Sequence, residues 1–210
     1  MDRPFEVDPL EYPFADHWFP YRDGVIHYID EGSGPTVRLL PGNPTWSYLY
    51  RDVIKPLRGE CRLVAPDYPG FGMSPPPTQY AVTPQEHAGA ITQLIGHLEL
   101  TNLVLAVQDW GGPIGMSYAV QNRKNLRGVV VMNTWAWPPS GLQLIFSLVM
   151  GGWPIGYLLQ TRRNYFAKSM LPDGNFCSDR VTTTLRKAYT DPFPNPKSRI
   201  PTWIFPRQIL

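Results

Sequence analysis

Cysteine is scarce in this 210-residue sequence. The two cysteines, Cys61 and Cys177, lie far apart and have no Cys-x-x-Cys or Cys/His metal-ligand spacing. Two free thiols in a reducing compartment are therefore expected, rather than a disulfide or a metal site. The sequence gives no reason to expect any cofactor.

A large excess of charge and a long unbroken apolar run are also missing. The formal net charge is +2 and the charged residues are interspersed, so nucleic acid is not an implied partner. The N-terminus lacks the apolar core of a signal peptide. The longest apolar stretch, residues 142–159, is interrupted by glycines and a proline. A cytoplasmic protein without a membrane span is therefore expected.

Proline, in contrast, is abundant, with 24 of 210 residues against a usual share of about 5%. Many prolines follow residue 135, where short helices and constrained loops are expected. Before that, short β-rich runs alternate with helical patterns, which predicts a doubly wound, mostly parallel α/β sheet. The expected strands cover 25–29, 36–40, 62–65, 103–107 and 128–132, and helices are expected over 47–57, from 84 onward, and over 111–121.

The helix from residue 84 has a clear start signal. Thr83 is predicted to cap its free N–H groups, and Pro84 stands at the first helical position, where a missing N–H costs nothing. Glu86 is predicted to complete a capping box.

One expected strand end carries a candidate nucleophile. Asp109 stands between a continuous apolar strand and two glycines that open a helix, which is the pattern of a nucleophile elbow. The sequence contains no Gly-x-Ser-x-Gly, which argues against serine-hydrolase chemistry. A carboxylate can instead attack carbon and form an ester. Taken alone, Asp109 could equally be a helix cap.

Four segments together resemble the haloalkane dehalogenases, a family with the α/β-hydrolase fold. Residues 40–51 resemble their Leu-His-Gly-Asn-Pro-Thr-Trp segment, and residues 108–112 resemble their nucleophile segment. Residues 65–74 resemble their Asp-x-x-Gly-x-Gly-x-Ser loop, a feature of many α/β-hydrolases. Residues 202–209 resemble the segment in which their cap returns to the sheet. The resemblance covers most of the chain.

The resemblance implies hydrolytic dehalogenation of a small apolar haloalkane, with Asp109 as nucleophile and an aspartyl ester as intermediate. The side-chain amide of Asn43 and the indole N–H of Trp110 are the implied donors to the leaving halide ion. The backbone N–H groups of the same two residues are the implied oxyanion donors. A turn role for Asn43 and core packing for Trp110 are the alternatives. Four aromatic residues are candidate pocket liners: Trp135, Phe146, Phe166 and Phe205.

The resemblance also implies a core over 1–134, a helical cap over 135–205, and the start of a return to the core over 206–210. The family continues with two strands and a helix that supply its catalytic histidine. A truncated chain is therefore expected, one that alkylates Asp109 but releases product poorly. Residues 128–132 would then form an uncovered, aggregation-prone sheet edge.

Other residues bear on that expectation. The histidines, His17, His27, His87 and His97, are expected in early strands and in one helix. Asn133 occupies the place of the acidic residue of one subfamily, and Pro41 stands where the family has histidine. Proline removes a backbone donor from the loop before Asn43.

Two alternative functions remain open on the sequence. One is an epoxide hydrolase, or an α/β-hydrolase of specialised metabolism, with Tyr157, Tyr165 and Tyr189 as candidate epoxide activators. Asn43 favours the dehalogenase, because epoxide hydrolases usually carry an aromatic residue there. The other is a catalytically silent, truncated homologue. The sequence does not indicate an oligomeric state.

Overall fold

The computed structural model describes residues 1–173 and 181–209, which form two compact units. The first comprises Met1–Pro4 and Asp8–Ala136, and the second comprises Phe5–Val7 and Trp137–Leu210. The division after Ala136 lies close to the core boundary expected after residue 134. Residues 206–209, expected to begin a return to the core, belong to the second unit. Cys61 is a free thiol, whereas Cys177 lies outside the described residues.

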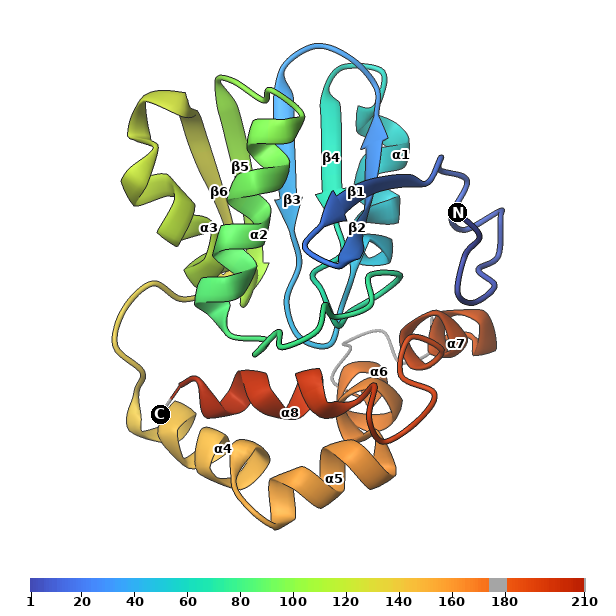
Figure 1. Cartoon of the computed structure of the whole chain (residues 1–210), viewed down its shortest axis with the longest axis vertical. Helices are drawn as coiled ribbons and strands as arrows, with labels where there is room; N and C mark the ends of the chain where they lie inside the picture. Colours follow the sequence, from blue (N-terminus) through green and yellow to red (C-terminus); the bar gives the residue numbers. More distant parts are fainter. Residues whose placement is uncertain (174–180, 210) are drawn as a thin grey trace. The chain divides into compact units, whose positions relative to one another are not determined.

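The first unit is built on a six-stranded sheet of order β1-β2-β4-β3-β5-β6 (Figure 1). Strands β4, β3, β5 and β6 run parallel, and β2 pairs antiparallel with both β1 and β4. The predicted mostly parallel α/β fold is confirmed. The strands are β1 (His17–Tyr21), β2 (Gly24–Glu31), β3 (Thr36–Leu40), β4 (Arg62–Pro66), β5 (Leu103–Asp109) and β6 (Leu126–Thr134).

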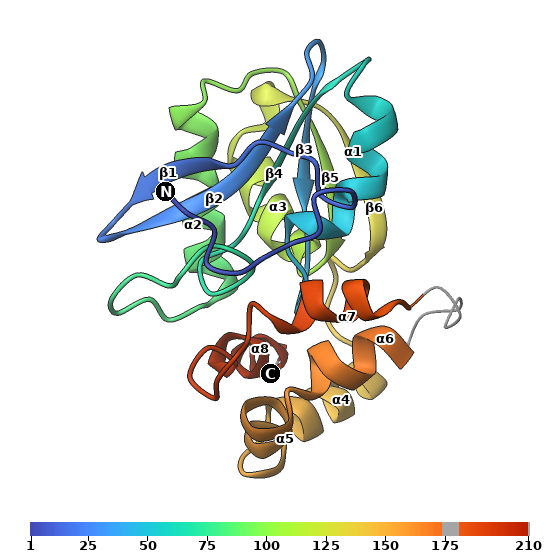
Figure 2. The same ribbon diagram turned by 90° about the vertical axis from the view of Figure 1, so that its right-hand side faces the viewer.

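Helices cover both faces of this sheet, with α1 on one side and α2 on the other (Figure 2). Helix α3 packs against α2 and β5. The close approach of α3 requires Gly115, because a Cβ there would lie 2.7 Å from Val107 and 3.0 Å from Leu40. The helices of this unit are η1 (Ser47–Tyr50), α1 (Arg51–Leu57), α2 (Pro84–His97), α3 (Gly111–Gln121) and η2 (Arg123–Asn125).

Helix α2 begins as predicted in one respect and differently in another. Thr83 Oγ1 accepts a hydrogen bond from the Glu86 N–H at 3.3 Å, which confirms the predicted cap. The predicted capping box is wrong in its second half. The Glu86 carboxylate accepts from the backbone N–H groups of Ala81 (2.5 Å) and Val82 (3.1 Å), where the chain turns through a left-handed φ of 59° at Val82.

Strand β6 is the last strand of the described sheet, and it is partly uncovered. It pairs with β5, and Val129, Val130 and Val131 are 37%, 48% and 57% exposed. The expected uncovered edge is therefore confirmed within residues 1–173 and 181–209. Aggregation at this edge stays a prediction.

The second unit is helical, as expected for its proline-rich sequence. Helix α4 begins with a capping box between Ser140 and Gln143. It packs closely on α8, and this close approach requires Gly151, since a Cβ there would lie 2.7 Å from the Arg207 backbone nitrogen. No single described helix is long and apolar enough to cross a membrane; α4 and α5 meet that criterion only jointly, across a bend of 62°. The helices are α4 (Gly141–Gly151), α5 (Ile155–Arg163), η3 (Phe166–Met170), α6 (Leu171–Asp173), α7 (Thr183–Thr190) and α8 (Ile200–Arg207).

Candidate active site

Asp109 ends β5 in a strained turn that leads directly into α3. Its φ of 50° lies in the left-handed region, which is uncommon for a residue with a side chain and often marks a functional site. Oδ1 of Asp109 accepts a hydrogen bond from the Asn43 backbone N–H at 2.8 Å. Because β3 and β5 are parallel neighbours, the loop that carries Asn43 and the elbow that carries Asp109 meet at the carboxyl ends of these strands.

Glycines make this close approach possible. A Cβ on Gly42 would lie 2.2 Å from Asp109 Oδ1, and one on Gly111 would lie 2.1 Å from the Leu40 carbonyl oxygen. A Cβ on Gly112 would overlap the hydroxyl of Thr134, which donates to the Asp109 carbonyl oxygen at 2.5 Å. Sequence reasoning did not identify Thr134, and its only sequence signal is its place at the end of β6.

The surroundings of the Asp109 carboxyl group change its acidity. Burial raises its pKa from 3.8 to about 6, and the backbone N–H groups of Trp110 and Asn43 oppose that rise by stabilising the anion. The group is therefore mostly ionised at neutral pH while it is poorly hydrated. A carboxylate in this state is a stronger nucleophile than one surrounded by water.

The Asn43 loop is held by hydrogen bonds on both sides. Thr45 Oγ1 donates to the Gly42 carbonyl at 2.9 Å, and the Ser47 N–H donates to Asp67 Oδ1 at 2.8 Å. The Asn43 N–H still reaches Asp109, although Pro41 has no N–H of its own. The anchoring role of Asp67 is visible only in the structure, because the sequence indicated Asp67 only as part of a widespread loop motif.

Trp110 and Trp135, two of the candidate aromatic residues, are in contact in the first unit. Their rings pack edge to face with centroids 5.0 Å apart, and Trp110 is buried. In the second unit, Phe146 stacks on Phe166 at 6.2 Å and Phe205 is fully buried. Whether these three phenylalanines line a substrate pocket stays a prediction.

The four histidines have other neighbours. His27 is fully buried, with Nδ1 2.9 Å from Asp67 Oδ2 and Nε2 3.0 Å from Asp16 Oδ1. His87 Nδ1 lies 3.0 Å from the Tyr80 hydroxyl, and burial lowers the pKa of His87 to about 3. The rings of His17 and His97 pack against Tyr28 and Phe19, respectively.

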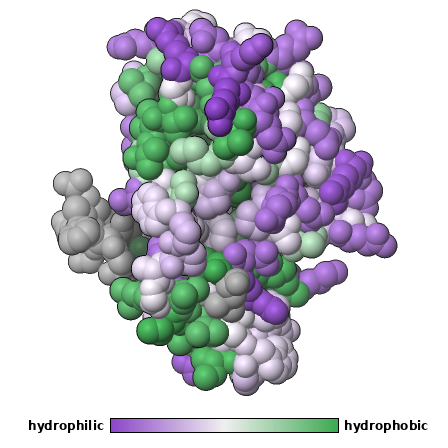
Figure 3. Space-filling view, turned by 90° about the vertical axis from the view of Figure 1, so that its left-hand side faces the viewer, coloured by the Kyte–Doolittle hydropathy of each residue, from purple (hydrophilic) through white to green (hydrophobic). Residues whose placement is uncertain are grey.

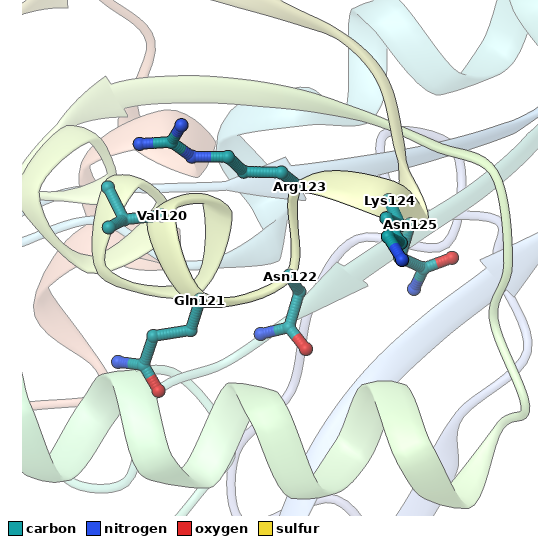
Figure 4. Close-up of a pocket in the computed structure, with 6 residues that line it drawn as sticks. All are labelled: Val120, Gln121, Asn122, Arg123, Lys124 and Asn125. Atoms are coloured by element: carbon teal, nitrogen blue, oxygen red, sulfur yellow. The ribbon is translucent and has the colours of Figure 1, made fainter.

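A surface hollow of about 410 Å³ lies elsewhere on the first unit (Figure 4). It is lined by residues 120–125, at the end of α3 and just before β6 begins. Because β5 and β6 are parallel, this hollow lies near the amino ends of the strands, whereas Asp109 lies at the carboxyl end of β5. Its lining side chains include no carboxylate, so it is not a second candidate for a mechanism through an aspartyl ester.

Comparisons with known proteins identify the family of the chain. The alpha/beta hydrolase fold family matches residues 35–193, and the chain belongs to that family. All of the chain aligns at 43% identity with haloalkane dehalogenase 2 of Mycobacterium tuberculosis strain H37Rv and spans 73% of its length. The chain is therefore a haloalkane dehalogenase-like α/β-hydrolase.

The chain is also similar to one further curated protein and to a solved structure. The cis-3-alkyl-4-alkyloxetan-2-one decarboxylase of Xanthomonas campestris is 33% identical over 94% of this chain and 70% of its own. The crystal structure of the haloalkane dehalogenase DatA from Agrobacterium tumefaciens C58 is 27% identical, with a TM-score of 0.81. That match covers 92% of this chain and 67% of the DatA chain.

Proposed function

We propose that Asp109 dehalogenates a small haloalkane by nucleophilic substitution. One oxygen of its carboxylate attacks the carbon that bears the halogen and forms an ester bond. The carbon–halogen bond breaks, and its electron pair leaves with the halide ion. The Asn43 side-chain amide and the Trp110 indole N–H donate to that ion. In the hydrolytic step, water attacks the ester carbonyl while the backbone N–H groups of Asn43 and Trp110 stabilise the oxyanion.

The observation that supports this proposal most directly is the Asn43 N–H···Oδ1 contact of 2.8 Å in the strained elbow. It places a carboxylate against a donor that can stabilise negative charge, first on the carboxylate and later on the tetrahedral oxygen. The same carboxylate has its pKa raised to about 6 by burial, which keeps it reactive and mostly ionised. The 43% identity to a haloalkane dehalogenase supports a halogenated substrate.

Ester hydrolysis needs a general base, and we infer from the contacts of His27 and His87 that neither can serve as that base at Asp109. The two ring nitrogens of His27 are engaged by carboxylates, and burial keeps His87 neutral with a low pKa. We therefore expect the aspartyl ester to form faster than it is hydrolysed, so that the alkylated protein accumulates.

The test is to incubate the 210-residue protein with 1,3-dibromopropane and follow both bromide and protein mass. We expect about one equivalent of bromide and a bromopropyl adduct, recognised by the bromine isotope doublet, on the peptide that contains Asp109. Asp109→Asn should give neither. Absence of adduct and bromide from the wild-type chain would disprove the function, whereas many equivalents of bromide would disprove only the slow hydrolysis.

A second substrate class follows from the 33% identity to the oxetanone decarboxylase. A carboxylate that attacks carbon can also open a strained four-membered lactone. A cis-3-alkyl-4-alkyloxetan-2-one and styrene oxide should therefore be assayed beside the bromoalkane. We expect the bromoalkane to react fastest, and a faster reaction of either oxygen heterocycle would reassign the activity.

A further inference from the structure

The second unit exposes an unusually apolar surface on α4 and α5. Leu142, Ile145 and Val149 recur at helical spacing on α4, with exposed fractions of 78%, 60% and 48%. On α5, Ile155 and Leu158 are 63% and 48% exposed. Figure 3, viewed from the left-hand side of Figure 1, shows hydrophobic side chains gathered on the part of the surface where α4 lies. We call the apolar face formed by Leu142, Ile145, Leu148, Val149, Trp153, Ile155 and Leu158 the α4–α5 surface.

Two exposed tryptophans lie before α4 and between α4 and α5. Trp137 precedes α4 and is 62% exposed, whereas Trp153 lies between the two helices and is 73% exposed. Trp153 packs against the Tyr157 ring at 4.8 Å. Tryptophan is typical of positions where a protein meets the boundary between lipid and water, because its ring is apolar and its N–H is polar.

The segment that carries the α4–α5 surface has charged residues of one sign only. The sequence has no aspartate or glutamate between Asp109 and Asp173. Arg162 and Arg163 end α5 and are exposed, and exposed Lys168 follows in η3. Because Ile155, Leu158 and Arg162 are spaced three and four residues apart, the apolar side chains and a cation share one face of α5.

We propose that the α4–α5 surface binds an anionic lipid bilayer, with both helices lying in the interface. Apolar side chains, flanking tryptophans, neighbouring cations and no acidic residue are the combination that such a surface requires. An interfacial arrangement suits this geometry, since no single described helix is long enough to cross a bilayer and α4 and α5 are bent by 62° from one another. This proposal is independent of the dehalogenase activity.

The test is to sediment the 210-residue protein with vesicles of phosphatidylcholine alone or mixed equally with phosphatidylglycerol. We expect binding to the anionic vesicles, at least about tenfold weaker binding to the neutral ones, and loss of binding at high salt. The triple variant Ile145→Gln, Leu148→Gln, Ile155→Gln should bind about tenfold more weakly or worse. Its matched control, Val120→Gln with Val131→Gln, changes equally exposed valines of the first unit and should bind like the wild type.

A second measurement uses the wild-type chain and does not depend on the folding of the triple variant. Vesicles that contain brominated acyl chains should quench tryptophan fluorescence of the wild-type chain, and Trp153→Phe should reduce that quenching. Absence of vesicle binding would overturn the proposal, as would equal binding by the triple variant and the wild type. A wild-type dimer that becomes monomeric in the triple variant, without vesicle binding, would assign the α4–α5 surface to a second copy of the chain instead.

Discussion

At the residue scale, three buried ionisable side chains of the first unit differ in what surrounds them. Asp109 faces backbone N–H groups, and His27 lies between two carboxylates. Arg38, in the centre of β3, is fully buried, and its Nε, Nη1 and Nη2 atoms have no hydrogen-bond partner among the described residues. Burial therefore raises the pKa of Asp109, the proposed nucleophile, is offset by two carboxylates at His27, and is only partly offset at Arg38 by the charge of Asp30.

The first prediction concerns the pH dependence of Asp109 alkylation. Burial raises the pKa of Asp109 to about 6, so the nucleophilic anion is lost as the pH falls through that value. The alkylation rate should be constant above pH 7 and about half-maximal near pH 6, measured by mass spectrometry of the adduct. A rate that is unchanged down to pH 4.5 would show that the carboxyl group is as exposed as that of a model peptide.

A second prediction concerns Arg38. Burial lowers the pKa of its guanidinium to about 10, because the charged form loses hydration and the charge of Asp30 offsets only part of that loss. Arg38→Met should raise the free energy of unfolding in urea by about 1–3 kcal/mol. The control is Arg62→Met, which removes a guanidinium paired with Asp30 at 2.6 Å and should leave stability unchanged or slightly lower. Destabilisation by Arg38→Met would mean that the guanidinium is satisfied in solution.

At the element scale, the site is made by two loops that approach each other within hydrogen-bond distance. The turn after β3 supplies Gly42 and Asn43, and the elbow after β5 supplies Asp109. The first loop is fixed from within by Thr45, which donates to the Gly42 carbonyl, and the second is fixed by Thr134 of the neighbouring strand β6. The parallel order β3-β5-β6 brings these three segments together.

Gly42→Ala tests how closely those loops must approach. The new Cβ would lie 2.2 Å from Asp109 Oδ1, so either the carboxylate or the loop must move. We expect the alkylation rate to fall by about 100-fold or more, because a displacement of about 1 Å at a reacting group has that effect. Gly59→Ala is the matched control, since nothing lies within 4 Å of its Cβ position, and it should react within about twofold of the wild type. Equal rates for both variants would contradict the proposed geometry.

At the scale of the whole molecule, a buried polar network joins distant parts of the first unit. Arg3 Nε donates to Asp16 at 2.7 Å, and Asp16 and Asp67 bind the two ring nitrogens of His27. Asp67 also holds the Ser47 N–H, next to the loop that carries Asn43. The network therefore connects the N-terminal segment, β2 and the loops that support the candidate site.

This network predicts a pH-dependent stability. Burial alone would lower the pKa of His27, but Asp67 and Asp16 raise it from 6.5 to about 9. Since the folded state binds the proton more tightly, the stabilisation is fully present below pH 6.5 and is lost as the pH rises through 9. The free energy of unfolding should fall by about 3 kcal/mol between these limits.

Urea denaturation of matched variants isolates the His27 contribution. His27→Gln should be about 3 kcal/mol less stable than the wild type at pH 6 and should lose most of the decline between pH 6.5 and 9. His97→Gln, which changes an exposed histidine, should keep the wild-type profile. An undiminished decline in His27→Gln would assign the pH dependence to other groups.

The sequence by itself determined the sheet, the elbow and the family resemblance. These follow from local signals: apolar runs of strand length, a helix start at Thr83 and Pro84, and glycines where the backbone must approach closely. Only the tertiary structure decided how Thr134, Asp67 and Arg38 are placed, because their partners lie on other strands and loops. Contacts between segments depend on strand order and register, which single-segment patterns do not contain. The exposure of the α4–α5 surface was also decided only by the tertiary structure, because a run of apolar residues does not show whether its side chains are buried or exposed.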